Sequence, residues 1–370
     1  PYLIATADQL AAIQNDLDAY YQLTDDIVLS GTWTPIGAFD AEEDGETPKT
    51  EAAFTGTFDG NGKTISGLTV NNDFAAGLFG CVANGTVKNV TVKDATVSGG
   101  CMVAAVVGYA YDSTVENVTL TASESKTNTI TCRQFYYGKD LAAPNMMAGI
   151  VGAGMRSTIT DCKVENTKLT ANGFETAYGW GTNVHDIGLL GGGLEDTSLS
   201  GCKVQDSAIT ITGPSAYGIG GLSGCAMVAG SVTDCSVSNV TIEMGDNANL
   251  VGGLVGYTGK TDGEVTELTG CTTTGVSITV GATSYRIGGL IGGGFYLPGA
   301  YYASYFPVPT SYKVAGYGVT GVEITTGDNS AALGLVAGQG YLSTITGETA
   351  SGKINGSDST TICGASEDKN

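Results

Sequence analysis

Apolar and polar residues alternate in short segments that recur along the whole chain. Residues 115–120 (VENVTL), 159–164 (ITDCKV) and 232–237 (VTDCSV) show the pattern, and a second alternating stretch such as 208–212 (AITIT) follows most of them. A period of two predicts a β-strand with one buried face. Gly, Asn and Asp separate the segments and β-branched residues are abundant, so the pattern favours many short strands over helices.

A Gly-Leu-hydrophobic-Gly motif precedes these segments and marks a repeat. Its eight copies are residues 77–80, 105–108, 149–152, 188–191, 221–224, 253–256, 289–292 and 334–337. The motif ends 28 residues apart at Gly80 and Gly108, but 45 residues apart at Gly292 and Ala337. A fixed coil of about 28 residues with insertions explains this spacing. The sequence therefore predicts an all-β fold, a right-handed, single-stranded parallel β-helix with three strands per coil.

The two ends of the chain differ from the repeats. Residues 6–17 are expected to form a short amphipathic helix that starts with a capping box at Thr6 and Gln9 and covers the first coil. The expected boundaries are 1–30 for the capping helix and first strand, 31–354 for the β-helix coils, and 355–370 for a polar C-terminal tail. All three belong to one structural domain.

Several of these segments resemble the GLUG-motif family of bacterial surface proteins. The likeness lies in GLFG at 77–80, in WTPIG at 33–37 and in FTGTFDGNGKTI at 54–65, and it extends over nearly the whole chain. It implies GLUG-type coils on the outside of bacteria, as in adhesin-like proteins and in the non-catalytic region of immunoglobulin A1 peptidases. It implies no activity by itself. The chain departs from those peptidases because it has a single His, His185, and no His-Glu-x-x-His zinc motif.

Charge and hydropathy narrow the range of partners. The net charge is −21 and only 14% of the residues are charged, which argues against nucleic acid as a partner because phosphate binding needs clustered Lys and Arg. No run of 18 apolar residues is present, so we expect no membrane insertion. The chain begins at Pro1 without a Met or a signal peptide, and we expect it to be a piece of a longer extracellular or bacterial cell-surface protein.

Four cysteines occupy one slot of successive repeats. Cys162, Cys202, Cys235 and Cys271 hold the position that Val90 and Val118 hold earlier. Exchange with Val predicts buried thiols on the inner face. Metal binding would require Cys-x-x-Cys spacing, which is absent, whereas disulfides between adjacent coils stay open as an alternative.

Candidate catalytic groups are few. His185 stands beside Asp186, and acidic pairs that could serve glycoside hydrolysis are Asp25 with Asp26, Glu195 with Asp196, and Asp161 aligned with Asp234. Hydrolysis needs two carboxylates about 5–9.5 Å apart, and Gly201 interrupts the alignment of the last pair. Asp59 begins a DGNG stretch that lacks a calcium-ligand pattern and indicates a tight corner. We expect no catalytic residue, no metal and no cofactor.

Aromatic residues are the most informative functional feature. The chain has 18 Tyr, against 9 Phe and 2 Trp, and many lie in insertions that precede a Gly-Leu motif, hence at one corner of successive coils. The ligand-binding candidates are Phe135, Tyr136, Tyr137, Tyr178, Trp180, Tyr217 and Tyr285, with Tyr301, Tyr302 and Tyr305 after the seventh motif. Loops on a rigid scaffold are frequent binding sites, and Tyr and Trp suit recognition.

The sequence thus predicts a non-catalytic, extracellular, adhesin-like binding module of a bacterial surface protein. We expect it to be monomeric and to recognise a host or mucosal glycan or protein through its aromatic insertions. Two alternatives are a polysaccharide hydrolase or lyase on a β-helix scaffold, and a ligand-free structural stalk.

Overall fold

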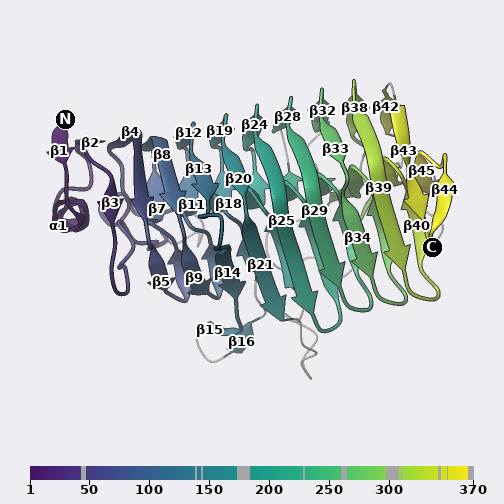
Figure 1. The fold of residues 1–370 in the computed structure, drawn as a ribbon, viewed down its shortest axis with the longest axis horizontal. Helices are drawn as coiled ribbons and strands as arrows, with labels where there is room; N and C mark the ends of the chain where they lie inside the picture. The colour runs from purple at the N-terminus through teal and green to yellow at the C-terminus, as the bar shows by residue number, and fades with distance from the viewer. Residues whose placement is uncertain are drawn as a thin grey trace.

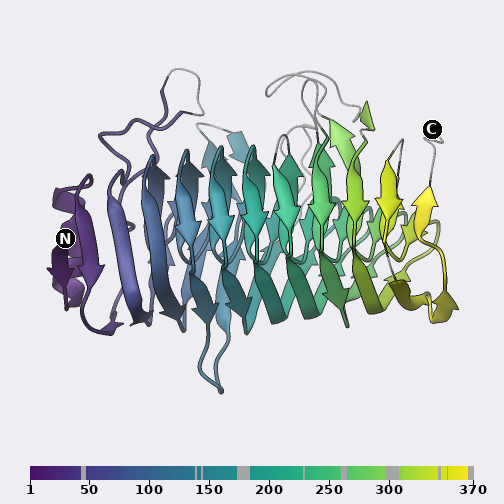
Figure 2. The same ribbon diagram turned by 90° about the horizontal axis from the view of Figure 1, so that it is seen from above.

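The computed structural model describes residues 1–42, 47–137, 140–142, 145–172, 184–227, 230–259, 265–296, 308–309, 311–340, 343–347 and 349–365. Within these ranges the chain winds into a right-handed parallel β-helix, which confirms the predicted fold (Figures 1 and 2). Like strands of successive coils pair in parallel and form three sheets along the long axis. No helix of the described ranges is long and apolar enough to cross a membrane.

Sheet 1 contains 25 of the described strands. They are β1 (Tyr2–Ile4), β2 (Tyr20–Leu23), β3 (Ile27–Val28), β4 (Thr57–Ser66), β5 (Thr69–Asn71), β8 (Thr86–Lys93), β9 (Thr96–Gly99), β12 (Thr114–Glu116), β13 (Thr119–Thr121), β14 (Asn128–Cys132), β19 (Thr158–Thr160), β20 (Lys163–Glu165), β21 (Thr167–Asn172), β24 (Ser198–Ser200), β25 (Lys203–Thr212), β28 (Ser231–Thr233), β29 (Ser236–Met244), β32 (Glu267–Thr269), β33 (Thr272–Thr274), β34 (Ser277–Val280), β38 (Lys313–Ala315), β39 (Gly318–Thr326), β42 (Thr344–Thr346), β43 (Thr349–Ile354) and β44 (Ser357–Ser359).

Sheets 2 and 3 receive one strand from each coil on either side of the Gly-Leu motif. Sheet 2 comprises β6 (Phe74–Ala76), β10 (Cys101–Val103), β17 (Asn145–Met147), β22 (Val184–Gly188), β26 (Ala216–Gly220), β30 (Asn249–Gly252), β35 (Tyr285–Gly288) and β40 (Ala331–Gly334). Sheet 3 comprises β7 (Phe79–Ala83), β11 (Val107–Tyr111), β18 (Val151–Met155), β23 (Gly191–Glu195), β27 (Ser223–Met227), β31 (Val255–Gly259), β36 (Ile291–Tyr296), β41 (Ala337–Gln339) and β45 (Cys363–Ala365), with β37 (Val308–Pro309) antiparallel to β36.

The last glycine of the motif lets sheets 2 and 3 touch backbone to backbone. A Cβ added to Gly224 would lie 2.3 Å from the backbone N of Ile187 and 2.5 Å from the backbone C of Asp186. No side chain fits there. The pairing corrects the fourth and eighth repeats by one residue each. Val151 pairs with Gly191 and Ile291 with Ala337, so the equivalents of Gly152 and Gly292 are Gly192 and Gly338.

Turns within sheet 1 require a left-handed backbone. Asp161 and Asp234 have φ values of 53°, and Gly201 between them has 64°. Asp, Asn and Gly tolerate this region best. The alignment of Asp161 with Asp234 thus has a conformational cause in the corner itself.

The core consists of inward-facing ladders. One of them runs through Val92, Leu120, Val164, Val204, Val237, Thr273 and Val319, which pair in register and are all buried. The predicted cysteine slot forms another: Cys162, Cys202, Cys235 and Cys271 are buried and free, which confirms inward thiols.

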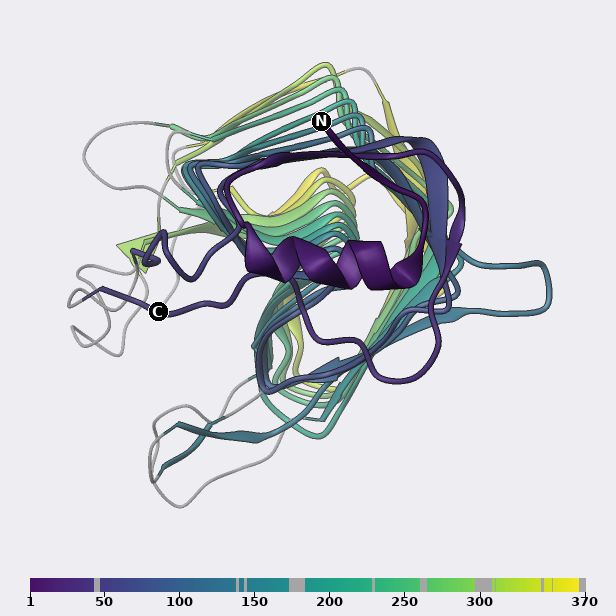
Figure 3. The same ribbon diagram turned by 90° about the vertical axis from the view of Figure 1, so that its left-hand side faces the viewer.

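The ends partly differ from the expectations. Helix α1 (Ala7–Ala11), capped at Thr6 by a 3.3 Å hydrogen bond from the Gln9 backbone N–H, continues only as a 3-10 turn (Ala12–Asn15). It still crosses the first coil, as Figure 3 shows. Residues 355–365 were expected in a polar tail, but β44 pairs with β43 and β45 pairs with β41. The solenoid therefore extends beyond residue 354.

Replacing Thr273 with Val should stabilise the protein by about 1 kcal/mol. The Thr273 Oγ1 is buried and has no hydrogen-bond partner in the described part of the chain, and Val has the same shape without the desolvation cost of the hydroxyl. Urea unfolding measures the difference. Thr272→Val on the exposed face of the same strand is the control, with an expected change within about 0.5 kcal/mol. A destabilised Thr273→Val protein contradicts the prediction.

Native protein at pH 8 should show one fast-reacting thiol. Burial raises the pKa of the Cys81, Cys101 and Cys271 thiols to about 12, so the reactive thiolate is scarce, whereas Cys363 is half-exposed. A colorimetric thiol reagent should therefore react quickly with one thiol of the native protein and with all nine thiols of the denatured protein. Cys363→Ser should remove the fast phase; a fast phase that survives would place an accessible thiol elsewhere.

Candidate functional site on the outer faces of sheets 2 and 3

One ladder of mostly half-exposed residues runs along the outer face of sheet 2, with Cys101 as a buried member. In-register pairing joins Phe74, Cys101, Asn145, His185, Tyr217, Asn249, Tyr285 and Ala331. Successive members are about 4.8 Å apart, the spacing of paired strands. We call these eight residues the outer ladder.

The outer ladder contains two of the predicted binding residues. Tyr217 and Tyr285 both pair with Asn249, so they lie two rungs apart on one face, as expected for residues at the same corner of successive coils. Phe135, Tyr136 and Tyr137 form β15 (Phe135–Tyr137), antiparallel to β16 (Asp140–Ala142); their side chains lie outside the described part. Tyr178, Trp180, Tyr301, Tyr302 and Tyr305 lie outside the described residues.

The centre of the site is a hydrogen-bonded chain of three side chains. The His185 Nδ1 lies 2.9 Å from the Asp186 Oδ2, and the Tyr257 hydroxyl donates to the Asp186 Oδ1 at 2.9 Å. The side chain of His185 is 24% exposed and that of Asp186 10%, while Tyr257 is 1% exposed. The buried carboxylate therefore has a partner for each oxygen, as burial of a charge requires.

Tyr257 reaches Asp186 across two coils because the residue between them has no side chain. Gly218 has a φ of 68°, and a Cβ there would lie 2.5 Å from the Tyr257 Cε1 and 2.9 Å from the Asp186 Oδ1. Any larger residue would displace the ring or the carboxylate. The contact joins β31 of sheet 3 to β22 of sheet 2.

Tyr217, which belongs to the next coil, stacks on the imidazole of His185. The His185 and Tyr217 rings are stacked with centroids 5.1 Å apart and planes 11° apart. Burial, followed by the nearby Asp186 carboxylate, raises the pKa of both the Tyr217 and the Tyr257 hydroxyl. Both therefore remain protonated donors at neutral pH.

Tyr285 is placed differently, since a guanidinium covers its ring. The Arg286 Cζ lies 4.5 Å from the ring centroid, a cation–π contact. Arg286 also donates to the Gln339 Oε1 and, at 3.5 Å, to the Asn249 Oδ1. This end of the outer ladder thus combines an aromatic ring with amide and guanidinium groups.

Two other acidic residues, Asp26 and Asp59, have local structural partners. The Asp26 Oδ1 accepts a 2.8 Å hydrogen bond from the Thr64 backbone N–H. The Asp59 Oδ1 accepts from the Asn61 backbone N–H at 2.8 Å and from the Asn89 Nδ2 at 3.0 Å, which supports a tight corner. In the ranges that the structure describes, no group of three His, Cys, Asp or Glu side chains could hold a metal ion.

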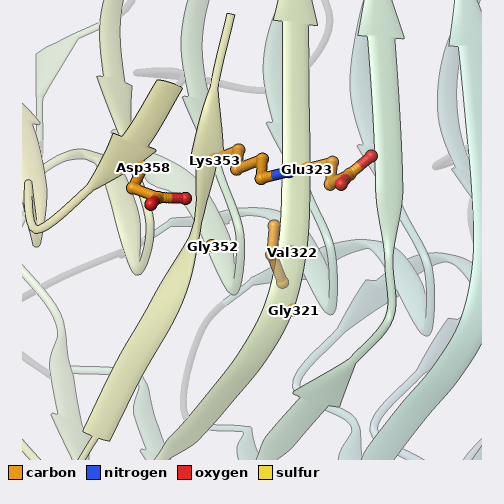
Figure 4. Close-up of a pocket in the computed structure, with 6 residues that line it drawn as sticks. All are labelled: Gly321, Val322, Glu323, Gly352, Lys353 and Asp358. Atoms are coloured by element: carbon orange, nitrogen blue, oxygen red, sulfur yellow. The ribbon is translucent and has the colours of Figure 1, made fainter. Parts of the chain in front are cut away.

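A shallow pocket of about 130 Å³ lies on the opposite part of the molecule, on sheet 1. Figure 4 shows its three charged lining residues, Glu323, Lys353 and Asp358, which lie on adjacent strands. The pocket is smaller than the roughly 300–1,000 Å³ usual for small-molecule sites. It offers no observation in favour of the hydrolase alternative.

The sequence pointed to His185, Asp186 and Tyr217 but not to Tyr257. Tyr257 follows the sixth Gly-Leu motif directly, as Tyr109 follows the second. Aligning the residue after each motif would have shown that this position faces outward, next to sheet 2. The contact itself could not be found from spacing, because it skips one coil.

Comparison with known proteins gives distant similarities. No family model matches the chain, so the GLUG-motif resemblance stays a prediction. Halomucin of Haloquadratum walsbyi (strain DSM 16790 / HBSQ001) is 32% identical over 168 residues, which cover 43% of this chain and 2% of halomucin. The matched region is thus a very small part of that relative.

Two solved structures are also similar. A Bacteroides ovatus protein assigned as an immunoglobulin A1 protease aligns with a TM-score of 0.47 and 15% identity, covering 99% of this chain and 84% of that one. The SRRP of L. reuters 100-23 aligns with a TM-score of 0.26 and 12% identity, covering 95% and 97%. Both scores are low, and the fold of this chain therefore rests on its own strand pairing.

Proposed function

We propose that the chain is a non-catalytic, extracellular binding module of an adhesin-like bacterial surface protein. The observation that carries the proposal is the outer ladder, which aligns Tyr217, Tyr285 and two Asn side chains in one half-exposed row. Aromatic and amide groups on a rigid scaffold suit recognition of a glycan or a host protein.

Charge and similarity support this function. A net charge of −21 keeps an exported protein soluble and disfavours nucleic acid. The similarity to halomucin over 168 residues fits a module of a large surface protein. The binding partner is a host or mucosal glycan or protein, and the module acts as a monomer.

Tyr285→Ala should weaken adhesion of the purified chain to mucin-coated or epithelial-cell surfaces, roughly threefold to tenfold, because truncation removes a ring and its cation–π contact. Tyr20→Ala is the matched control, since Tyr20 is also half-exposed but belongs to sheet 1. Surface plasmon resonance or cell-binding assays measure the change.

The same assays separate the alternatives. Equal adhesion by wild type and Tyr285→Ala would show that this end of the outer ladder is not the binding surface. Absence of adhesion to every surface would favour a structural stalk. Release of reducing ends from a polysaccharide panel would favour an enzyme.

A further inference from the structure

The eight coils serve as internal controls for one another, because each has a residue with positive φ directly after its outer-ladder residue. These residues are Ala75, Met102, Met146, Asp186, Gly218, Leu250, Arg286 and Ala332. Alanine, methionine, leucine and glycine all satisfy the backbone at this position. The fold therefore does not require a carboxylate at Asp186.

Asp186 is nevertheless buried and fully engaged. A buried carboxylate costs free energy unless both oxygens find donors, and here His185 and Tyr257 supply one each at 2.9 Å. Gly218, from the coil between them, leaves the space through which the Tyr257 ring passes. Residues from three coils are thus arranged around a group that the solenoid does not need.

The arrangement fixes one state of the imidazole. A carboxylate at Nδ1 favours the tautomer with the proton on Nδ1, which leaves Nε2 as an acceptor when the ring is neutral. Stacking on Tyr217 fixes the ring plane. Within the described part of the chain no group hydrogen-bonds the Nε2, and the side chain is 24% exposed.

We propose that His185 is the hydrogen-bond acceptor of a subsite for an uncharged carbohydrate, with Asp186 and Tyr257 as positioning residues. This inference rests on the proposed function and names its ligand class. Sugar hydroxyls donate to an imidazole nitrogen, and the Tyr217 ring stacked on the imidazole adds an aromatic group beside it. A net charge of −21 repels acidic glycans.

His185 is the only His of the chain, so protein labelled with ¹⁵N-histidine reports on this site alone. Two-bond ¹H–¹⁵N spectra recorded at alkaline pH should show the Nδ1–H tautomer. N-acetyllactosamine should shift the Nε2 signal more than the Nδ1 signal. Its sialylated counterpart should cause a smaller shift at the same concentration.

Asp186→Asn should invert the tautomer, because the Asn amide can donate to Nδ1 while its oxygen still accepts from Tyr257. Affinity for N-acetyllactosamine should then fall roughly tenfold, the loss of one hydrogen bond. Asp234→Asn, at a positive-φ position of sheet 1, is the matched control and should change neither property. Gly218→Ala, which blocks Tyr257, should weaken binding without altering any ligand-contacting group.

The outcomes distinguish this inference from the proposed function. An Nε2–H tautomer in the wild type, or glycan binding that leaves the His185 signals unchanged, overturns the subsite while adhesion stands. Binding to protein surfaces alone overturns the carbohydrate class. Failure to bind any glycan, mucin or cell overturns both.

Unfolding experiments test whether Asp186 and Tyr257 act as a pair. Asp186→Ala should lower the thermal midpoint, because the buried Tyr257 hydroxyl loses its hydrogen bond to the carboxylate. The backbone itself accepts alanine here, as Ala75 and Ala332 show. Adding Tyr257→Phe should restore part of the loss. Strictly additive losses in the double variant would show that the two side chains do not interact.

Discussion

Backbone contact between sheets 2 and 3 is the constraint on which the rest of the structure depends. The strand before each Gly-Leu motif and the strand after it pack very closely. The glycine at the end of the motif therefore contacts the backbone of the positive-φ residue one coil earlier. Cβ atoms added at Gly108, Gly152, Gly256 or Gly292 would approach backbone atoms within about 2.6 Å, a distance that no side chain tolerates. One glycine per coil therefore sets the shape of the cross-section and, through parallel pairing, its repetition.

This constraint divides the residues of each coil into two groups. Inward ladders are almost entirely apolar: Val115 pairs with Ile159 and Val87 with Phe58, all of them buried. Thr273 carries the cost of an unpaired hydroxyl. Outward positions of sheets 2 and 3 carry no such demand. They hold Phe, Asn, His, Tyr and Ala in turn, and recognition can vary there without endangering the fold.

The sequence predicted the fold well because its signals are local and repeated. Period-two segments, the Gly-Leu motif and the cysteine slot each recur, and the cap at Thr6 is a four-residue pattern.

Errors arose where the signal is weak. Leu189 and Leu190 hide the register of the fourth repeat, and polar residues after 354 still pair as strands because backbone hydrogen bonds do not depend on side-chain polarity. The contact of Asp186 with Tyr257 spans 71 residues and depends on a missing Cβ at Gly218, which spacing alone does not show.

A repeat protein offers a comparison that single-copy folds lack. Seven coils satisfy the positive-φ position with varied side chains. One coil instead has the buried Asp186 carboxylate with two hydrogen-bond donors, and the stability of the fold does not explain this difference. Desolvating Asp186 opposes folding unless its hydrogen bonds offset the cost, and apolar residues such as Ala75 and Leu250 occupy the equivalent position of other coils. The residues that follow the repeat explain how the chain folds. Those that depart from it at a cost, beside the outer ladder, mark the position where we propose that the molecule binds its ligand.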